Sequence, residues 1–262
     1  MQKNSWLDPE EVDTGPYPVG ALHVTLRRNE KEIPPHEHVT GQLIFALDGA
    51  VTCEVPGSLW MVPPGCAVWV PAGARHSCRS TTNAKVCFLF VKAGAAALAD
   101  GCRSIQISPM VREMILHLAD HPCHEPGDAH ALRLMRVLLS ELERMPQTSF
   151  QLPVPAHPQL RQIVDALIRD PAQRRTLAQW AGSLAMSERT LARLVIRETG
   201  MSFGRWRRQL HLLVALRQLA GGAQVQQISD MLGYGSATAF ITMFKKASGM
   251  TPNAYFRGAE PA

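Results

Sequence analysis

The sequence predicts a multidomain α and β protein, in which an antiparallel β-sandwich or barrel is followed by helices that continue to the C-terminus. Three observations support this fold class. Short strand-like runs recur up to about residue 92, patterns with a 3.6-residue period begin at Pro109, and a proline-rich stretch precedes the last hundred residues. A chain of 262 residues is long enough for two domains of ordinary size.

The first elements follow from hydrophobic patterning. The runs ALHVTL, QLIFAL, VTCEV, CAVWV and KVCFLFV are separated by Gly, Pro and Asn, as in a sheet of short strands. Amphipathic helices are expected at 109–119 and 128–144. The segment 146–158 holds four prolines in thirteen residues and is expected to be an extended linker. The apolar stripes of the two helices are Met110, Met114 and Leu118, and Leu132, Met135, Leu139 and Leu142.

Cysteine usage and hydropathy predict the compartment. The first twenty residues are acidic and lack the apolar core of a signal peptide, and the cysteines form no CxxC pair. The longest apolar runs fall well short of the ~20 residues that span a bilayer. We expect a cytoplasmic protein with reduced thiols and no membrane insertion. The six cysteines are Cys53, Cys66, Cys78, Cys87, Cys102 and Cys123.

Charge is distributed unevenly along the chain. Residues 1–155 carry 13 Lys and Arg against 16 Asp and Glu, a net charge of −3. Residues 156–258 carry 14 against 5, a net charge of +9. A cationic module of this size indicates a polyanionic partner, most plausibly nucleic acid.

The basic segment contains one helical motif twice. In 176–200 two short apolar stripes meet at a tight break, where Met186 lies and Ser187 is suited to cap the second helix. The pattern returns in 225–249 with GYGS at the break. Between them a helix of about 17 residues, about 26 Å long, could hold two recognition helices about 34 Å apart, one turn of duplex DNA. This is helix-turn-helix geometry in tandem.

These motifs, together with SERTLARL, RETGMSF and the closing FKKASGMTPNAYFR, resemble the DNA-binding domain of AraC/XylS-type bacterial transcription regulators over about residues 158–257. The resemblance implies a regulator that binds double-stranded promoter DNA, works with RNA polymerase and is associated with the bacterial nucleoid. One departure is His211, which stands where the family often has an arginine.

The resemblance also implies which residues contact DNA. The sharper base contacts come from the second helix of the first motif, where Arg189 and Arg193 are suited to read guanine with two hydrogen bonds. The second motif offers hydroxyl and methyl contacts, with lysines for the DNA backbone. The alternative is that the arginines only solvate helix faces, but +9 around two such motifs argues against it. The expected DNA-binding residues are Arg189, Thr190, Ala192, Arg193, Arg197, Thr238, Ile241, Thr242, Lys245 and Lys246.

A second resemblance lies in the β-like part. His36 and His38 share strand parity, and Gln42 follows with the same parity. With Gly65, Pro71, Gly73 and His76 they resemble the two signature motifs of the cupin β-barrel over about residues 19–92.

In metal-binding cupins, three histidines and a glutamate hold a divalent ion. Here Gln42 stands in the glutamate position, and Ser80 stands where an asparagine is usual. The resemblance therefore leaves two alternatives. His36, His38, Gln42 and His76 hold zinc, nickel or iron, or the same residues bind a small organic effector and no cofactor is required. Cys78 shares the parity of His76 and is expected to face the same pocket.

A further cluster lies between the two amphipathic helices. His117 and His121 are four residues apart, as in some zinc sites. The alternative, which we favour, is a polar loop that happens to be rich in histidine. The full cluster is His117, His121, Cys123, His124 and His130.

We therefore expect a sequence-specific transcription regulator whose promoter binding is modulated by a small molecule or a metal, and not an enzyme. The alternative is a metal-dependent cupin oxygenase or isomerase that carries a DNA-binding tail. We expect a homodimer formed through the connector helices. The expected domains are a cupin-like sensor at 1–104, a helical connector at 105–145, a proline-rich linker at 146–157 and the DNA-binding domain at 158–258.

Overall fold

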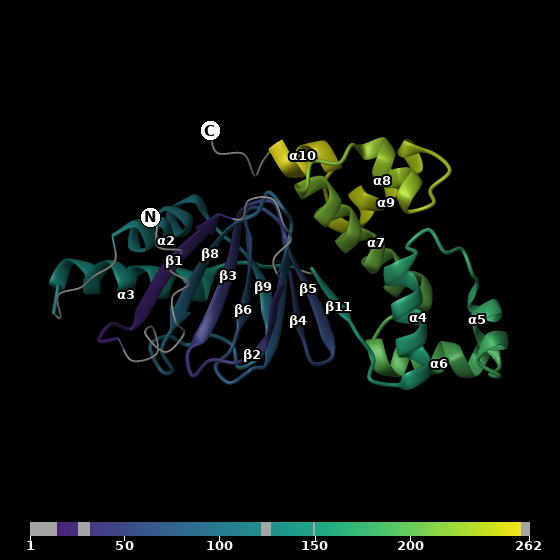
Figure 1. Cartoon of the computed structure of the whole chain (residues 1–262), viewed down its shortest axis with the longest axis horizontal. Coiled ribbons are helices and arrows are strands. Elements are labelled where there is room, and N and C mark those ends of the chain that lie inside the picture. Colours follow the sequence, from purple (N-terminus) through teal and green to yellow (C-terminus); the bar gives the residue numbers. More distant parts are fainter. Residues whose placement is uncertain (1–14, 26–31, 122–126, 149, 258–262) are drawn as a thin grey trace. The chain divides into compact units, whose positions relative to one another are not determined.

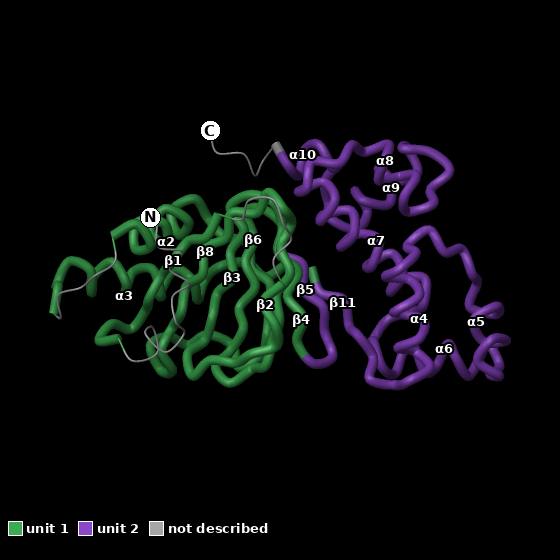
Figure 2. The backbone as a smooth tube through the Cα atoms, in the orientation of Figure 1, with its two compact units in different colours: residues 1–55, 62–150 green, residues 56–61, 151–262 purple. Residues whose placement is uncertain are grey.

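The computed structural model of the chain describes residues 15–25, 32–121, 127–148 and 150–257 (Figure 1). The backbone divides into two units (Figure 2). Unit 1 consists of Met1–Val55 and Val62–Phe150, and unit 2 of Pro56–Met61 and Gln151–Ala262. The β-rich part and the connector helices therefore belong to one unit, and the basic helical segment belongs to the other.

Unit 1 is built from two antiparallel layers of strands. Its larger sheet has the order β1-β8-β3-β6-β9-β10, and β2, β7 and β4 are neighbours in the second layer. The sandwich or barrel predicted from the strand-like runs is thus present. The strands of the unit are β1 (Val19–Thr25), β2 (Glu32–His36), β3 (Gly41–Asp48), β4 (Val51–Val55), β6 (Cys66–Val70), β7 (His76–Ser80), β8 (Lys85–Val91), β9 (Arg103–Gln106) and β10 (Gln147–Thr148).

The larger sheet is apolar on both faces. In β3, Leu43 and Phe45 join the core that contains the connector helices, so the alternating residues Gln42 and Ile44 point to the opposite face, toward the second layer. This explains why β3, β6 and β8 read as almost continuous hydrophobic runs. It also gives the polar Gln42 a buried position between the layers.

The connector helices cover the outer face of the larger sheet. They are α2 (Pro109–Asp120), which packs against β1 and β8, and α3 (Ala129–Arg144). Ser108 and Asp128 cap them by accepting backbone N–H groups of the first turn. The stripe predicted for the first helix is wrong at one position, because Val111, Ile115 and Leu118 are buried while Met110 is 52% exposed. The larger sheet decides which face of α2 is buried, and the sequence pattern does not reveal where that sheet lies.

The segment expected to be a proline-rich linker takes part in sheets. Residues 147–148 form β10, which pairs with β9. In unit 2, β11 (Gln151–Pro153) pairs with β5 (Ser58–Val62). The segment is extended, as expected, but its backbone hydrogen bonds are made to strands that are distant in the sequence.

Gly41 at the start of β3 permits a close contact with Trp69 of β6. A Cβ atom at Gly41 would lie 2.0 Å from Cη2 of the Trp69 ring, and Nε1 of that ring donates to the carbonyl oxygen of Ala99 at 2.8 Å. We expect Gly41→Ala to lower the free energy of unfolding by about 1–3 kcal/mol in urea titrations, because the buried ring must move. Gly101→Ala is the matched control, since nothing lies within 4 Å of its added Cβ. Equal stability of the two variants would contradict the steric explanation.

Unit 2 is mainly helical. Figure 1 shows α7 running between the pair α8 and α9 and the group α4, α5 and α6. Among the described residues, none of the helices combines the length and the hydropathy needed to cross a bilayer. The helices are α4 (Pro158–Arg169), α5 (Leu177–Ser183), α6 (Glu188–Thr199), α7 (Phe203–Ala220), α8 (Val225–Met231), α9 (Ala237–Ser248) and α10 (Pro252–Arg257).

The two helix-turn-helix motifs repeat their local geometry. Both first helices, α5 and α8, begin with a capping box, formed by Thr176 in one and Gln224 in the other. Both then close with a hydrogen bond of 2.9 Å, from Met186 N–H to the Ala181 carbonyl and from Tyr234 N–H to the Ser229 carbonyl. Each turn also contains a residue with a left-handed backbone: Ala185 (φ 53°) and Gly233 (φ 72°).

The joining helix α7 is the scaffold of unit 2. It has 18 residues, about 27 Å at 1.5 Å per residue, close to the predicted length. It packs against α6, α8, α9 and α10, and residues from both ends are buried. This packing places both recognition helices on one support.

His211, in the middle of α7, is buried rather than exposed to a phosphate. Its Nε2–H donates to the carbonyl oxygen of Pro171 at 3.1 Å, so Nδ1 carries the lone pair and accepts from the Tyr234 hydroxyl at 3.0 Å. Burial raises the pKa of Tyr234, which keeps this donor protonated. Burial, with a smaller contribution from Arg207, lowers the pKa of His211 to about 4. The neutral imidazole therefore joins the second motif to the segment that precedes the first.

Candidate DNA-binding face and effector site

The recognition helix of the first motif, α6, begins as the sequence predicts. The Ser187 side chain accepts the N–H of Thr190 at 3.1 Å, and the two hydroxyl oxygens lie 2.8 Å apart. Leu191 and Val195 are fully buried and hold the helix on its support. The capped first turn is exposed, which is the position from which such helices reach base edges.

Three arginines line the exposed side of α6. Arg189, Arg193 and Arg197 follow one another at intervals of four residues and therefore share a helix face, and all three are exposed. Arg197 forms an ion pair with Glu198 at 3.0 Å. Ala192 is half-buried beside them and Thr190 is exposed.

The sequence did not single out an apolar group on the same face. A hollow of about 580 Å³ lies against α6, and its lining includes Ile196 between Arg193 and Arg197. Ile196 is 53% exposed. An isoleucine outside the buried stripe of a recognition helix was the signal that could have identified it. The complete lining is His157, Met186, Thr190, Arg193, Leu194, Ile196 and Arg197.

The second recognition helix, α9, carries a less polar face. Thr238 and Thr242 are exposed, but the Thr242 hydroxyl donates to the Thr238 carbonyl oxygen at 2.8 Å and is partly used within the helix. Ile241 is half-buried. Lys245 and Lys246 are exposed in the last turn of α9. The face offers positive charge at one end and few donors for base edges elsewhere.

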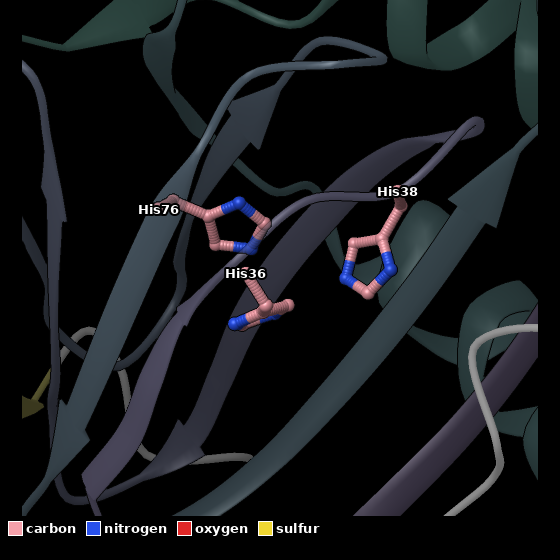
Figure 3. A group of neighbouring side chains, drawn as sticks. All are labelled: His36, His38 and His76. Carbon is pink, nitrogen blue, oxygen red and sulfur yellow. The ribbon is translucent and has the colours of Figure 1, made fainter.

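In unit 1, two histidines that are close in the sequence, His36 and His38, converge with the distant His76 (Figure 3). His36 ends β2, His38 follows it in the loop, and His76 begins β7 directly opposite His36 in the sheet register. The ring centroids are 4.3 Å apart for His36 and His76, 4.8 Å for His36 and His38, and 5.5 Å for His38 and His76. His38 and His76 are buried and His36 is half-buried.

Backbone carbonyl groups determine the tautomers of two of these rings. Nδ1 of His36 donates to the carbonyl oxygen of Pro34 at 2.7 Å, and Nδ1 of His76 donates to that of Ala74 at 2.9 Å. The remaining lone pair of each ring is therefore on Nε2. Burial, with smaller contributions from the other two histidines, lowers the pKa of His76 to about 4. At neutral pH its ring is uncharged.

Gln42 completes the cluster from β3. Its carboxamide lies 2.8 Å from Nε2 of His76 through the atom assigned as Oε1. Because Nε2 of the neutral ring can only accept, the hydrogen bond requires the carboxamide to present its N–H group there. Gln42 is 5% exposed. Glu37, which lies between His36 and His38 in the sequence, is exposed and has the opposite parity.

Comparison with known proteins supports both expected domain types. A helix-turn-helix domain family matches residues 180–258, and a cupin domain family matches residues 22–92. The transcriptional regulator NimR of Escherichia coli K12 is 48% identical over 227 residues, which cover 87% of this chain and 83% of NimR. The chain belongs to the AraC family of transcription regulators.

Two more distant likenesses extend over most of the chain. The transcriptional activator RhaS of Yersinia pestis is 25% identical over 250 residues, which cover 87% of this chain and 91% of RhaS. The crystal structure of ToxT from Vibrio cholerae O395 superposes with a TM-score of 0.40 at 11% identity, covering 93% of this chain and 98% of ToxT. The AraC-type chain is a DNA-binding transcription regulator with a cupin domain. NimR is named as a transcriptional regulator and RhaS as a transcriptional activator.

The histidine cluster of this AraC-type regulator fits a divalent transition metal. The ligand nitrogens of His36, His38 and His76 all lie within 4.8 Å of one another. A tetrahedral ion with bonds of about 2.0–2.1 Å would place ring centres roughly 5 Å apart, within the observed range. It would also bring the nitrogens to about 3.3 Å, so a small rotation of the side chains is required. The backbone carbonyl oxygens that accept from Nδ1 of His36 and His76 are usual outer partners of metal-bound histidines.

Cys78 lies on the same side of β7 as His76, as parity predicts, and is buried. It stands directly opposite Cys53 of β4 in the sheet register. A hydrogen bond with Cys78, together with burial, raises the pKa of the Cys53 thiol well above its usual value. The Cys53 thiol is therefore held protonated inside the barrel.

The second histidine cluster is only partly described. The rings of His117 and His121 stack on α2 at 4.6 Å, and both residues are exposed, as is His130. Cys123 and His124 lie outside the described residues. Within the described part of the chain, His36, His38 and His76 form the one group of three or more ligands close enough to share an ion.

Proposed function

We propose that this AraC-type regulator senses a small molecule or a divalent metal at His36, His38, Gln42 and His76 and changes its affinity for promoter DNA in response. The observation that carries the proposal is the convergence of three imidazoles and a carboxamide inside the cupin unit of a chain whose other unit is a double helix-turn-helix. Zinc, nickel and iron(II) suit three imidazoles, and metal-free binding of an organic effector is the second form of the proposal. Cys78 lines the same interior as a small apolar group.

We infer that α6 contacts the DNA bases and that α9 mainly contacts the DNA phosphate backbone. Arg189 and Arg193 present exposed guanidinium groups from the first turns of α6, where bidentate contacts to guanine are made. Thr190 and Ala192 lie next to them along α6 and would contact the same stretch of DNA. Arg197, Lys245 and Lys246 supply phosphate contacts, and Thr238, Ile241 and Thr242 contribute short-range contacts without long donors.

For the enzyme alternative, the described cluster offers no acid or base beyond the three imidazoles that would hold the metal. An oxygenase or isomerase needs a group that moves protons beside the metal, and the described cluster contains imidazoles and a carboxamide but no carboxylate. Glu37, which carries the carboxylate of this motif, is exposed. We therefore propose a sensor that binds its ligand without converting it.

The remaining parts of the proposal concern assembly and location. We propose a homodimer that acts with RNA polymerase in the bacterial cytoplasm, associated with the nucleoid. The apolar stripes of α2 and α3 are packed inside unit 1, so a dimer contact through these helices would use their outer faces, where Met110 and Val137 are about half exposed, at 52% and 50%. Sedimentation of the purified chain tests this part separately.

The decisive experiment is DNA capture with the full chain. Purified protein is mixed with fragments of its own genome at moderate ionic strength in excess bulk competitor, and the retained fragments are sequenced. We expect a shared sequence motif and dissociation constants of about 10⁻⁸–10⁻¹¹ M for the best fragments. Retention of all fragments alike, with and without candidate effectors, would contradict the proposal.

Sensing is tested on the fragment with the highest affinity. Zn²⁺, Ni²⁺ or a candidate effector should shift the affinity for this fragment, and DNA should shift the affinity for the ligand by the same factor. His76→Ala should bind DNA and lose this mutual shift. An identical shift in His76→Ala would place the sensor elsewhere.

A further inference from the structure

The residue that distinguishes this cupin unit is Gln42, and its contacts indicate the class of ligand. The inference rests on the proposed sensing function and names the chemistry of the effector. Gln42 is 5% exposed, and its carboxamide is in hydrogen-bond contact with Nε2 of His76. The substitution of an amide for a carboxylate therefore changes the charge of a buried site.

The described ligands of the site are all uncharged when they bind a cation. Three neutral imidazoles and one neutral carboxamide leave a bound divalent cation with its full double positive charge, whereas a carboxylate at position 42 would remove one unit of it. The described ligand group contains no Asp or Glu. A buried charge without a counter-charge is costly, so a cation in this site favours an anion from outside as an additional ligand.

The Gln42 carboxamide can donate a hydrogen bond to a ligand in the site. Without metal, the Gln42 carboxamide lies 2.8 Å from Nε2 of His76. Because Nδ1 of that ring donates to the Ala74 carbonyl oxygen, Nε2 accepts, and we infer that the N–H group of Gln42 is the donor. A cation bound to Nε2 takes over that lone pair and releases the N–H group, which then faces the ligand bound to the cation. A carboxylate at this position could only accept and would repel the same ligand.

The side of the cluster at His36 is the more exposed one. His36 is half-buried and ends β2, and β2 lies at the end of the strand order in its sheet. Among the residues that the structure describes, no further strand pairs with β2 on that side of the cluster. A ligand of a few heavy atoms can therefore approach the cation from the side of His36.

We propose that the barrel of this regulator binds a small carboxylate that completes the coordination of a divalent cation on His36, His38 and His76 and accepts a hydrogen bond from Gln42. The cation supplies charge and an open position, and Gln42 supplies the neutral donor that selects an anion. The effector class is thus a carboxylic acid in its ionised form.

The test uses the full chain loaded with Co²⁺, whose visible spectrum reports its ligands. Acetate is titrated against acetamide, which has a similar shape and no charge. We expect acetate to change the spectrum in a saturable manner and acetamide to leave it unchanged. His76→Ala should fail to retain Co²⁺.

The variant Gln42→Glu should retain Co²⁺ at least as tightly as the parent chain and bind acetate at least tenfold more weakly. Gln106→Glu is the matched control, because Gln106 is exposed on β9 and the same charge is added outside the cluster. It should behave as the parent chain does. Thermal unfolding of each variant checks that the fold is retained.

The proposal would be overturned if the parent chain failed to retain Co²⁺, if acetate and acetamide acted alike, or if Gln42→Glu bound acetate as the parent chain does. Capture of genomic DNA by the same preparation without metal is measured in parallel. Normal DNA capture with a failed acetate response would reject the carboxylate site alone, and failed capture would reject the proposed sensing of promoter DNA.

Discussion

Arg193→Ala is expected to weaken binding of the full chain to its preferred duplex by roughly 10- to 100-fold, about 1–3 kcal/mol, and to relax the choice of base at one position of the site. The reason is that Arg193 is exposed on the α6 face that also carries Arg189, where a guanidinium can donate two hydrogen bonds to one guanine. Electrophoretic or fluorescence titration against duplexes with each base at each position measures both effects. Arg189→Ala should relax the choice at a different position.

Two further variants separate base reading from charge. Lys245→Ala should weaken binding to all duplexes by a similar factor and reduce the slope of log affinity against log salt by about one unit. Arg79→Ala also removes one positive charge, but from an exposed ion pair with Glu32 in unit 1, and should change DNA affinity little. If Arg193→Ala lowered affinity equally for every duplex, its assignment as a base-reading residue would be wrong.

Acidification is expected to destabilise unit 2 through His211. The folded chain holds the pKa of His211 near 4 because the ring is buried, while the unfolded chain has the ordinary value of 6.5. Between these values the unfolded state binds more protons, so the free energy of unfolding falls as the pH falls. The contribution of the neutral ring is complete above about pH 7 and is lost as the pH passes through 4, at a cost of about 3 kcal/mol at most.

The measurement is urea unfolding between pH 4 and pH 8 for the parent chain and for His211→Gln. The variant should be less stable at pH 7, because the bridge between Tyr234 and Pro171 is weakened, and its stability should depend less on pH below 6.5. Tyr234→Phe removes only the hydroxyl donor and should keep most of the pH dependence. An unchanged pH profile in His211→Gln would show that another group is responsible.

Local patterns in the sequence were sufficient for most of unit 2 and for the connector helices. The predicted helices at 109–119 and 128–144 are found as α2 and α3 with boundaries shifted by one residue. Ser187 caps α6 as predicted, and the joining helix has nearly the expected length. Caps, turns and helical periods depend on residues within a few positions of one another, so a single chain reveals them.

Other features depended on pairings that are distant in the sequence. The pairing of His36 with His76 and the placement of Gln42 against His76 follow from the register of strands 34 to 40 positions apart. The burial of Val111 in place of Met110 follows from the sheet that α2 covers. The exposed Ile196 and the buried His211 also depend on which neighbours each helix face meets.

By itself the sequence determined the type of each element, the concentration of positive charge in the last hundred residues and the family to which the two motifs belong. Tertiary structure alone decided which hydrogen-bond donors meet which acceptors and which side of each connector helix is covered. It also decided the lowered pKa of His76 and of His211. The physical reason is that helix periods and caps arise from neighbours along the chain, whereas burial, register and pKa arise from groups that folding brings together.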